Sequence, residues 1–406
     1  RAADERATPA GLALTSPPMA RLPLPDRPPE RFRTRLLTVG PIPPEWGGDL
    51  RGGVTRFNVT LLDELRSRPW RHRVDPVGVL IPPPHRLRRR VAEVRSPLPV
   101  FLQPEGGRPR RYTRLLIERE RPDVVLLNNL AAFNGARYAR VQAQVAPEVP
   151  IVAVVHEWRA VRTKSGERRA RFLRAAQAAL DGVAAVVFPS RHTLEQGAED
   201  LALRYPERAL VIPNPLQPPF AKPGLVVGGE RSGVAFVGSF NERKNPAALI
   251  RAAAAMPDLE VTMQGRGPLE DELRALVAEL AIGDRVEFAP FVHPRKHVKA
   301  VIGVMRSAEL VCLPSLSESF GLVMIEALAA GAPVVGFGPT LREIGERTGI
   351  DVGEPVDEPT PENVGAAIEA VRSRSWDRER LRRAALAEFS AGSVARRYAK
   401  LLRNVA

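Results

Sequence analysis

Two carboxylates, Glu318 and Glu326, stand eight residues apart in the stretch ESFGLVMIEALAAG (318–331). The second is the one charged residue of a predicted helix, 321–330, that is otherwise apolar. A carboxylate in such a helix is costly to bury without a partner. Glu326 could form an internal salt bridge, to Arg342 or to another arginine, or it could bind a ligand.

The position of this predicted helix favours a ligand. It follows a predicted strand, LVCLP (310–314), so its N-terminus lies at the carboxyl edge of a sheet. The backbone of Phe320, Gly321 and Leu322 and the helix dipole would bind an anion there, and a glycine lets a ligand approach the backbone closely. Glu326 could accept hydrogen bonds from a ribose diol, and Glu318 could hold the hydroxyls of a second group. A ligand that has a phosphate between two groups bearing hydroxyls is a sugar nucleotide.

A second loop, in the sequence FVGSFNERKN (236–245), carries positive charge. A strand ends at Gly238, and Arg243 and Lys244 precede the next helix. A bound diphosphate needs cations in such a place. The alternative is that the two side chains form a solvated pair with no ligand.

Glycines and one histidine mark three more positions. MQGRGPLEDEL (263–273) allows a tight turn at Gly265, but it matches neither the dinucleotide fingerprint nor a P-loop. Gly52 and Gly53 open a helix in the first half of the chain, where the backbone could touch a phosphate or a sugar. His156 ends the apolar run IVAVV (151–155), again at a sheet edge, and could be structural or functional.

Short apolar runs alternate with helical patterns along the whole chain, which indicates parallel sheets covered on both faces. The runs are 35–39, 77–81, 123–127, 151–155 and 184–188, then 233–238, 259–265, 285–290, 310–314 and 332–337. A segment dense in Pro and Gly, 211–233, separates the two sets and predicts an interdomain linker. The fold class expected is therefore α/β, with two doubly wound parallel-sheet domains facing a cleft, the usual place for a ligand.

Composition limits the alternatives. The chain has 406 residues, 44% of them hydrophobic, and no apolar run long enough to span a membrane. Its Pro- and Arg-rich first 30 residues lack the apolar core of a signal peptide and predict a disordered tail. The lone Cys312 excludes an intrachain disulfide, fits a reducing cytosol and is expected to be buried and inert.

The net charge of +14 comes from arginine clusters at 85–90, 108–114 and 167–174. They are either solvated surface in an Arg-biased sequence or a site for an anionic partner such as a phospholipid surface. Nucleic acid is not expected, because aromatics make up only 5% and do not interleave with the basic residues. No Asp-x-Asp motif, His/Cys cluster of metal-ligand spacing or Gly-x-Ser-x-Gly elbow occurs.

Taken together, these motifs resemble glycosyltransferase family 4, the retaining enzymes of the GT-B fold. ESFGLVMIE matches the E-x(7)-E motif of that family, and FVGSFNERKNP, MQGRGPLEDELRALVAELAIGDRVEFAPFV, VIPNPL and VVHEW resemble its other conserved stretches. The resemblance covers about 34–405. It implies a tail over 1–30, an acceptor-side domain over 31–215, a donor domain over 216–389, and a C-terminal helix, about 390–406, that packs back on the first domain.

The resemblance also implies roles for individual positions. Lys244 would contact the donor diphosphate, Glu326 the ribose, and Glu318 with the backbone of 320–322 the sugar and phosphate. Val292 would lie by the base. Gly52, Gly53 and His156 would line the cleft from the acceptor side, and Glu318, His156 and Lys244 are the candidate catalytic residues.

This sequence departs from the family pattern at two places. Ser239 stands where the family often has Arg, so that Arg243 would have to supply the missing charge, and Lys-Asn replaces the usual Lys-Gly. The expected chemistry is front-face transfer with retention, with the leaving diphosphate stabilised by Lys244, Arg243 and the helix N-terminus. Neither a metal nor another cofactor is expected.

The predicted function is thus transfer of a sugar from a nucleotide-sugar donor, a UDP-sugar in preference to GDP-mannose, to a glycan or lipid-linked acceptor. The expected location is the cytoplasm, with peripheral contact to the inner face of an anionic membrane. Two alternatives stay open: an epimerase or phosphorylase of the GT-B type, and a catalytically silent nucleotide- or polyanion-binding protein, which the loss of Arg at Ser239 would favour.

Overall fold

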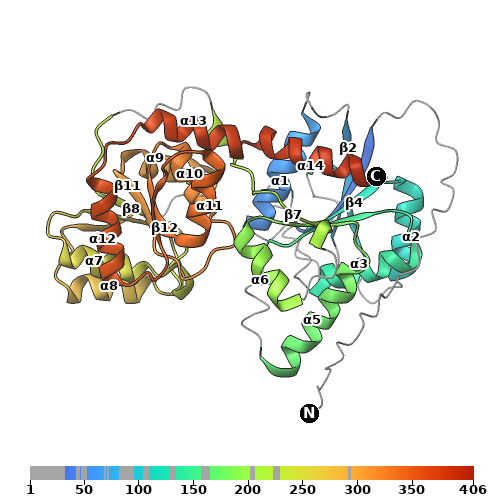
Figure 1. Ribbon diagram of the computed structural model, residues 1–406, viewed down its shortest axis with the longest axis horizontal. Helices are drawn as coiled ribbons and strands as arrows, with labels where there is room; N and C mark the ends of the chain where they lie inside the picture. Colours follow the sequence, from blue (N-terminus) through green and yellow to red (C-terminus); the bar gives the residue numbers. More distant parts are fainter. Residues whose placement is uncertain are drawn as a thin grey trace, which may run out of the picture. The chain divides into compact units, whose positions relative to one another are not determined.

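A computed structural model describes residues 33–42, 46, 53–67, 70, 73–81, 96–103, 109–128, 133–156, 165–201, 206–222, 229–290 and 294–406. The predicted disordered tail, 1–30, and the arginine cluster 85–90 lie outside these ranges. The described residues form two parallel sheets with helices on both faces (Figure 1). The predicted α/β fold class is confirmed.

The first sheet has seven strands in the order β3-β2-β1-β4-β5-β6-β7, all in parallel register. Its strands are β1 (Thr34–Val39), β2 (Val74–Ile81), β3 (Val100–Leu102), β4 (Val124–Asn128), β5 (Ile151–Val154), β6 (Ala185–Phe188) and β7 (Ala209–Val211). The helices are α1 (Gly53–Arg66), α2 (Pro109–Glu120), α3 (Phe133–Val145), α5 (Gly166–Leu180) and α6 (Arg191–Leu201).

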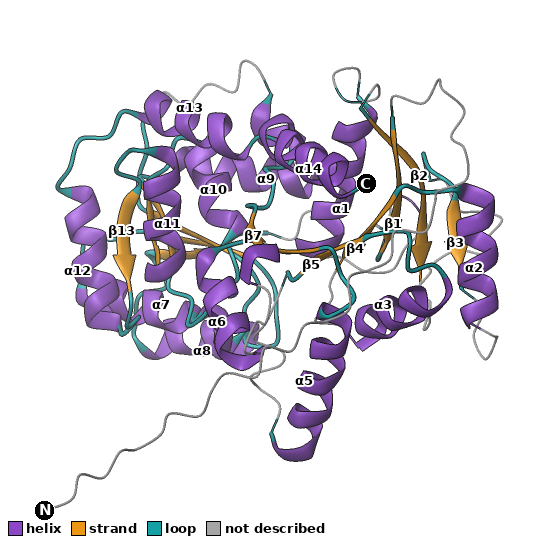
Figure 2. Cartoon of the chain, turned by 45° about the vertical axis from the view of Figure 1, so that its right-hand side comes forward, coloured by secondary structure: helices purple, strands orange, loops and turns teal. Residues whose placement is uncertain are grey.

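The second sheet has six strands in the order β10-β9-β8-β11-β12-β13. They are β8 (Val234–Val237), β9 (Val261–Gln264), β10 (Val286–Phe288), β11 (Leu310–Leu313), β12 (Val334–Phe337) and β13 (Gly353–Val356). The helices are α7 (Pro246–Ala255), α8 (Glu270–Glu279), α9 (Pro294–Ser307), α10 (Leu322–Ala329), α11 (Gly338–Thr348), α12 (Pro361–Arg372) and α13 (Arg378–Phe389). Figure 2 shows these helices on the two faces of the orange strands.

Continuous apolar strands are needed because each sheet is buried on both faces. Side chains alternate across a strand, so Leu36 of β1 packs in the layer of α1 while its neighbour Leu37 packs in the layer of α2, α3 and α5. In the second sheet, Val311 of β11 faces α10 and Cys312 faces α7 and α12. Cys312 is fully buried as a free thiol, and burial raises its pKa, which agrees with an inert side chain.

The last helix, α14 (Ala391–Val405), belongs to the core of the first sheet although it follows the second in sequence. Its residues Val394, Tyr398 and Leu402 are buried there, and the ring of Tyr398 lies 5.4 Å from that of Phe57 on α1. Figure 1 shows α14 alongside α1. The chain therefore crosses between the two sheets twice.

The segment predicted as an interdomain linker is in part packed against the second domain. β7 ends at Val211, and a 3-10 turn, Pro218–Ala221, follows. Leu216 and Phe220 are buried in the apolar cluster around α10, and the backbone of Leu216 bonds to the Phe389 carbonyl. The segment thus connects the two sheets, and its residues Leu216 and Phe220 are anchored in the core of the second.

None of the helices in the described ranges combines the length and the apolar character required to span a membrane.

Candidate active site

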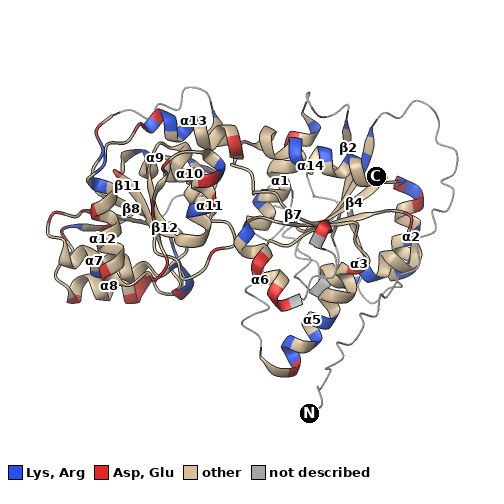
Figure 3. Cartoon of the chain, viewed as in Figure 1, with Lys and Arg blue, Asp and Glu red and all other residues tan. Residues whose placement is uncertain are grey.

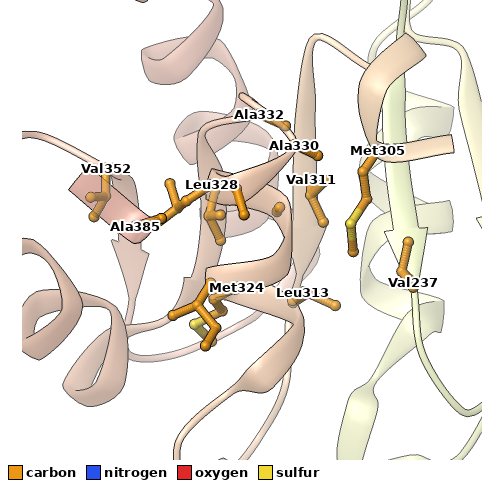
Figure 4. Close-up of a cluster of buried hydrophobic side chains, with 14 of the residues drawn as sticks. Val237, Met305, Val311, Leu313, Met324, Leu328, Ala330, Ala332, Val352 and Ala385 are labelled. Atoms are coloured by element: carbon orange, nitrogen blue, oxygen red, sulfur yellow. The ribbon is translucent and has the colours of Figure 1, made fainter. Parts of the chain in front are cut away.

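Helix α10 is the central element of the site, and its sequence explains its position. It follows β11 and buries Met324 and Leu328 among Val311 and Leu313 of that strand (Figure 4). Its N-cap is Gly321, at φ 78° and ψ 58°, a left-handed conformation that a glycine adopts without strain. The helix begins at Leu322, one residue later than predicted, and its first N–H groups have no helical acceptor.

Glu318, just before this helix, is bound by both predicted cations. The Lys244 ammonium pairs with Glu318 Oε1, and Arg243 Nη1 lies 3.3 Å from Oε2. Arg243 also donates to the Ser317 carbonyl at 3.0 Å. The two loops predicted separately from the sequence thus meet at one point, where two cations share one carboxylate.

The ionised form of Glu318 is stabilised by this arrangement. Burial alone would raise the pKa of its carboxyl, but the charges of Lys244 and Arg243, with the Lys244 hydrogen bond, outweigh burial and lower the pKa below the ordinary value of 4.5. Glu318 is therefore a carboxylate at neutral pH.

Glu326 lies in a different environment on α10. It is 2% exposed, Gln217 Nε2 donates to its Oε1 at 2.9 Å, and Arg56 Nη1 lies 3.5 Å away. The predicted partner Arg342 is wrong, because Arg342 bonds to Asp357 instead, at 2.8 Å. Arg56 belongs to α1 of the first domain, so the carboxylate does pair with an arginine, but one 270 residues away in sequence.

Burial dominates the electrostatics of Glu326. It raises the pKa of the carboxyl above 4.5, and the opposing effects of Arg56, the Gln217 hydrogen bond and Lys244 offset only part of this. The half-exposed Arg56 stabilises the ionised form of Glu326 only in part. A ligand group that donates hydrogen bonds, such as a diol, would stabilise it further.

His156 is buried at the carboxyl edge of the first sheet, two residues after β5. Its Nε2 lies 3.3 Å from Asn128 Oδ1, and its ring meets that of Phe57 edge-on at 4.6 Å. Burial lowers the pKa of His156 to about 3, so the ring is neutral at pH 7.

The remaining candidates divide into those that lie where the two domains meet and those that the structure places elsewhere. A Cβ at Gly53 would lie 3.7 Å from Leu322, so the glycine of one domain faces the helix start of the other. Phe320 packs its ring into the core, 5.8 Å from that of Phe389, which leaves only its backbone for a ligand. Gly52 and Val292 lie outside the described residues.

The loop glycine Gly265 has a packing role. A Cβ there would lie 1.9 Å from the Gly238 carbonyl oxygen, so only glycine lets the two loops touch. Ser239 is exposed, and its carbonyl accepts from Asn241 N. Asn245 adopts a left-handed conformation, φ 49° and ψ 45°, which Gly and Asn tolerate best. The change from Lys-Gly to Lys-Asn therefore preserves the backbone.

Four side chains of this site were not predicted from the sequence. Arg56 and Gln217 contact Glu326, and the hydroxyls of Ser190 and Thr193, on the turn before α6 and in its first turn, both donate to the Ser319 carbonyl. The only local signal was a Ser and a Thr three residues apart at a helix start, which also describes an ordinary cap. Within the described ranges, no three His, Cys, Asp or Glu side chains are grouped so as to hold a metal ion.

Comparison with models of known protein families identifies the family of this chain. The family described as Glycosyl transferases group 1 matches residues 222–387, and that described as Glycosyltransferase Family 4 matches residues 51–218. Together these matches cover most of the chain, one on each sheet. The chain belongs to glycosyltransferase family 4. The boundary between the two matches falls in the crossing that follows β7.

Relatives in family 4 include D-inositol 3-phosphate glycosyltransferases. The protein of that name from Mycobacterium sp. strain KMS is 44% identical over 121 residues, which are 28% of this chain and 26% of the relative. That of Mycolicibacterium smegmatis is 46% identical over 108 residues, 25% of this chain and 24% of the relative. The match thus spans about a quarter of the length of these relatives.

Solved structures share the fold over nearly the whole chain. Sucrose-phosphate synthase of Thermosynechococcus elongatus superposes with a TM-score of 0.67 at 18% identity, over 92% of this chain and 99% of that one. HepE of Anabaena, in complex with UDP, gives 0.65 at 18% identity, over 91% and 100%. At these identities the likeness establishes the GT-B fold.

Proposed function

We propose that this member of family 4 is a glycosyltransferase that moves a sugar from a nucleotide-sugar donor to a glycan or lipid-linked acceptor. The observation that carries the proposal is the meeting of Glu318, Lys244 and Arg243 beside the N-terminus of α10, with the buried Glu326 on the same helix. Cations and free N–H groups suit a diphosphate, and the two carboxylates suit hydroxyl groups.

The donor would exchange partners with side chains that are already paired. Its diphosphate would take the Lys244 ammonium and Arg243 from Glu318, and hydroxyls of the sugar would then bind the freed carboxylate. The ribose would likewise replace Arg56 at Glu326, where the arginine side chain is 45% exposed and free to move aside. A UDP-sugar is favoured, because HepE, which shares the fold, is described in complex with UDP-glucose. GDP-mannose is the alternative.

Front-face transfer with retention fits the charges of the site. In the proposed donor complex, hydroxyls of the sugar would occupy Glu318 and the ribose would occupy Glu326, so neither carboxylate is assigned to attack the anomeric carbon. The leaving diphosphate would be stabilised by Lys244, Arg243 and the start of α10, which provide positive charge without requiring a metal ion.

Contact with an anionic membrane is a further part of this proposal. Helices α2, α3 and α5 cover one face of the first sheet and carry many exposed arginines (Figure 3). Leu115 of α2 is 53% exposed between them. The exposed arginines are Arg110, Arg111, Arg114, Arg119, Arg121, Arg137, Arg140, Arg168, Arg171 and Arg174. Such a face would attract anionic lipid at about 1 kcal/mol for each basic residue near the surface.

Co-sedimentation tests the membrane contact. Replacement of Arg110, Arg111 and Arg114 by Glu should abolish sedimentation with vesicles of anionic phospholipid at low salt. The matched control replaces three other exposed arginines by Glu, Arg380 and Arg383 of α13 and Arg396 of α14, and should sediment as the wild type does. Equal loss in both variants would indicate general charge attraction and would count against a defined membrane face.

Thermal unfolding with nucleotides tests the donor site. UDP, GDP, ADP and their sugars are compared on the wild type and on Glu326→Gln, which keeps the shape of the side chain. A ligand at about 100 times its Kd adds roughly 2.7 kcal/mol to the stability of the folded state. A shift with one nucleotide, lost or reduced in the variant, supports the proposal. Binding without turnover of any sugar nucleotide would instead favour a silent binding protein.

A further inference from the structure

A row of hydrogen bonds joins three buried side chains at the carboxyl edge of the first sheet. Asn58, on α1, donates from Nδ2 to the Pro41 carbonyl at 2.9 Å. Asn128, the last residue of β4, donates from Nδ2 to Asn58 Oδ1. His156, beyond the end of β5, places Nε2 at 3.3 Å from Asn128 Oδ1. All three side chains are 6% exposed or less.

The direction of this row is fixed at its first member. The Pro41 carbonyl can only accept, so Asn58 must turn its NH₂ group toward it and its oxygen toward Asn128. Asn128 must then present its own NH₂ group to Asn58 and its oxygen to His156. An amide oxygen can only accept, so the proton of the neutral imidazole must be on Nε2.

The other ring nitrogen is left as an acceptor. His156 Nδ1 is buried and has no hydrogen-bond partner among the described residues. Among the described residues, the ring contacts the Asn128 amide and, edge-on, the Phe57 ring, which are both uncharged. Burial lowers the pKa of His156, and no charged group of the described part of the chain opposes this shift, so Nδ1 keeps its lone pair at neutral pH.

The backbone is shaped to admit this row. A Cβ at Gly40 would lie 3.0 Å from Asn128 Cβ and 3.0 Å from Asn58 Nδ2. Glycine at this position, directly after β1, makes room for the two amides side by side.

We propose that Asn58 and Asn128 are positioning residues that hold His156 as the Nε2–H tautomer, so that Nδ1 is a fixed hydrogen-bond acceptor for a substrate hydroxyl. The substrate part of this inference rests on the proposed function, whereas the tautomer does not. His156 then acts neither as a general acid nor as a cation toward the diphosphate. Its contribution is recognition of a hydroxyl, and a substrate without that hydroxyl would leave a buried acceptor unpaired.

Nitrogen-15 NMR of the full chain, labelled at its six histidines, reads the tautomer directly. The His156 signals are assigned by their absence in His156→Gln. At pH 7 the wild type should show a protonated Nε2 and an unprotonated Nδ1. In Asn128→Leu the Nε2 proton loses its acceptor, and both tautomers should appear. Asn58→Leu should act in the same direction, because Asn128 can then turn its amide. His192, whose Nε2 contacts Gln196, is an internal control that should not change.

Two results would overturn the inference: a wild-type His156 that is protonated on Nδ1 or cationic at pH 7, or an unchanged tautomer in Asn128→Leu. Thermal midpoints show whether each variant is folded, and Gly40→Ala is a third route to displace the amides if the leucine variants unfold. Release of UDP from UDP-glucose provides the second readout, in which Asn128→Leu should lower kcat/KM by about 10- to 100-fold. If the wild type releases no UDP while the tautomer is as expected, the proposed function with UDP-glucose fails and the positioning role stands.

Discussion

The Ser190 hydroxyl, on the turn that leads into α6, donates to the carbonyl of Ser319. Ser319 directly follows Glu318, in the loop that precedes α10. Thr193 donates to the same oxygen at 2.7 Å, and both side chains are fully buried. One domain thus holds the peptide that carries the candidate sugar-binding carboxylate of the other. The orientation of this peptide determines the direction of the next N–H groups, at the N-terminus of α10, which would bind a phosphate.

Removal of this pair of hydroxyls should weaken nucleotide binding. The double variant Ser190→Ala/Thr193→Val loses both hydrogen bonds to the Ser319 carbonyl, each worth about 1 kcal/mol. It also loses the bond from the Thr193 N–H to Ser190 Oγ at the start of α6. We expect the Kd for the stabilising nucleotide to rise by roughly 10-fold, measured by isothermal titration.

Two controls separate this effect from general destabilisation. Thr193→Ser keeps the hydroxyl and should bind as the wild type does. Thr348→Val removes a hydroxyl whose hydrogen bonds, to the Ile344 and Gly345 carbonyls, both lie within α11. Equal weakening in Thr348→Val would show that the loss reflects stability alone.

The cations beside Glu318 should differ in their effect on the nucleotide. Lys244 is 12% exposed and paired only with Glu318 among the described residues, whereas Arg243 also holds the Ser317 carbonyl. Lys244→Met should therefore lower UDP affinity by about 10- to 100-fold, the value of a charge-assisted hydrogen bond of 1.5–3 kcal/mol. Arg243→Met should also disturb the loop and lower the thermal midpoint of the ligand-free protein.

Calorimetric titration with UDP and with uridine shows whether Lys244 binds the diphosphate or the nucleoside. Lys244→Met should lose affinity for UDP but not for uridine, which has no phosphate. Arg266→Met, in a neighbouring loop with an exposed arginine, is the matched control. A Lys244 variant that binds UDP as the wild type does would remove the lysine from the diphosphate site.

The fold class and the two charged loops could be predicted from the sequence, because they depend on local patterns. Apolar runs predict buried strands wherever both faces are covered, as in β4, β8 and β11. The strand β13, GEPV, carries a Glu and a Pro in four residues and gave no such signal, and β3 and β7 have only three residues each. Short edge strands are set by pairing with a neighbour more than by their own composition.

The partners in the site could not be predicted, because they depend on which surfaces the tertiary fold brings together. Glu326 meets Gln217 and Arg56 over 109 and 270 residues. Arg342 is nearer in sequence, but it bonds to Asp357, which directly follows β13. The Asn58–Asn128 contact likewise has no local signature, since each Asn taken alone is an ordinary polar residue.

The two carboxylates should affect the pH dependence of stability with opposite signs. The pKa of Glu318 is lowered by its cations, so its ionised form stabilises the folded state above about pH 4.5 and that contribution is lost as pH falls through the lowered pKa. Glu318→Gln should therefore destabilise the protein at pH 7, by about 3 kcal/mol if Lys244 is left without a partner. The difference from wild type should shrink below pH 4.5.

Glu326→Gln should do the reverse. Burial raises the pKa of Glu326, so the folded state binds a proton more readily than the unfolded chain and its carboxylate costs stability above the raised pKa. The amide keeps an acceptor for Gln217 and removes the buried charge, and the variant should be as stable as the wild type or more stable at pH 8. Urea unfolding at pH 4, 6 and 8 checks both variants, and the same sign for the two at pH 8 would contradict this assignment.

A glycine that holds the cationic loop provides the last test. A Cβ at Gly265 would lie 1.9 Å from the Gly238 carbonyl oxygen, and the obstacle is backbone that cannot swing away. Gly265→Ala should displace the loop that carries Lys244, lower the free energy of unfolding by about 3 kcal/mol, and weaken nucleotide binding. Gly303→Ala is the matched control, because it lies inside α9 with open space where the Cβ would go. That variant should be stabilised by roughly 0.5–1 kcal/mol and bind nucleotide normally. Wild-type affinity in a measurably destabilised Gly265→Ala would mean that this contact supports the fold and not the site.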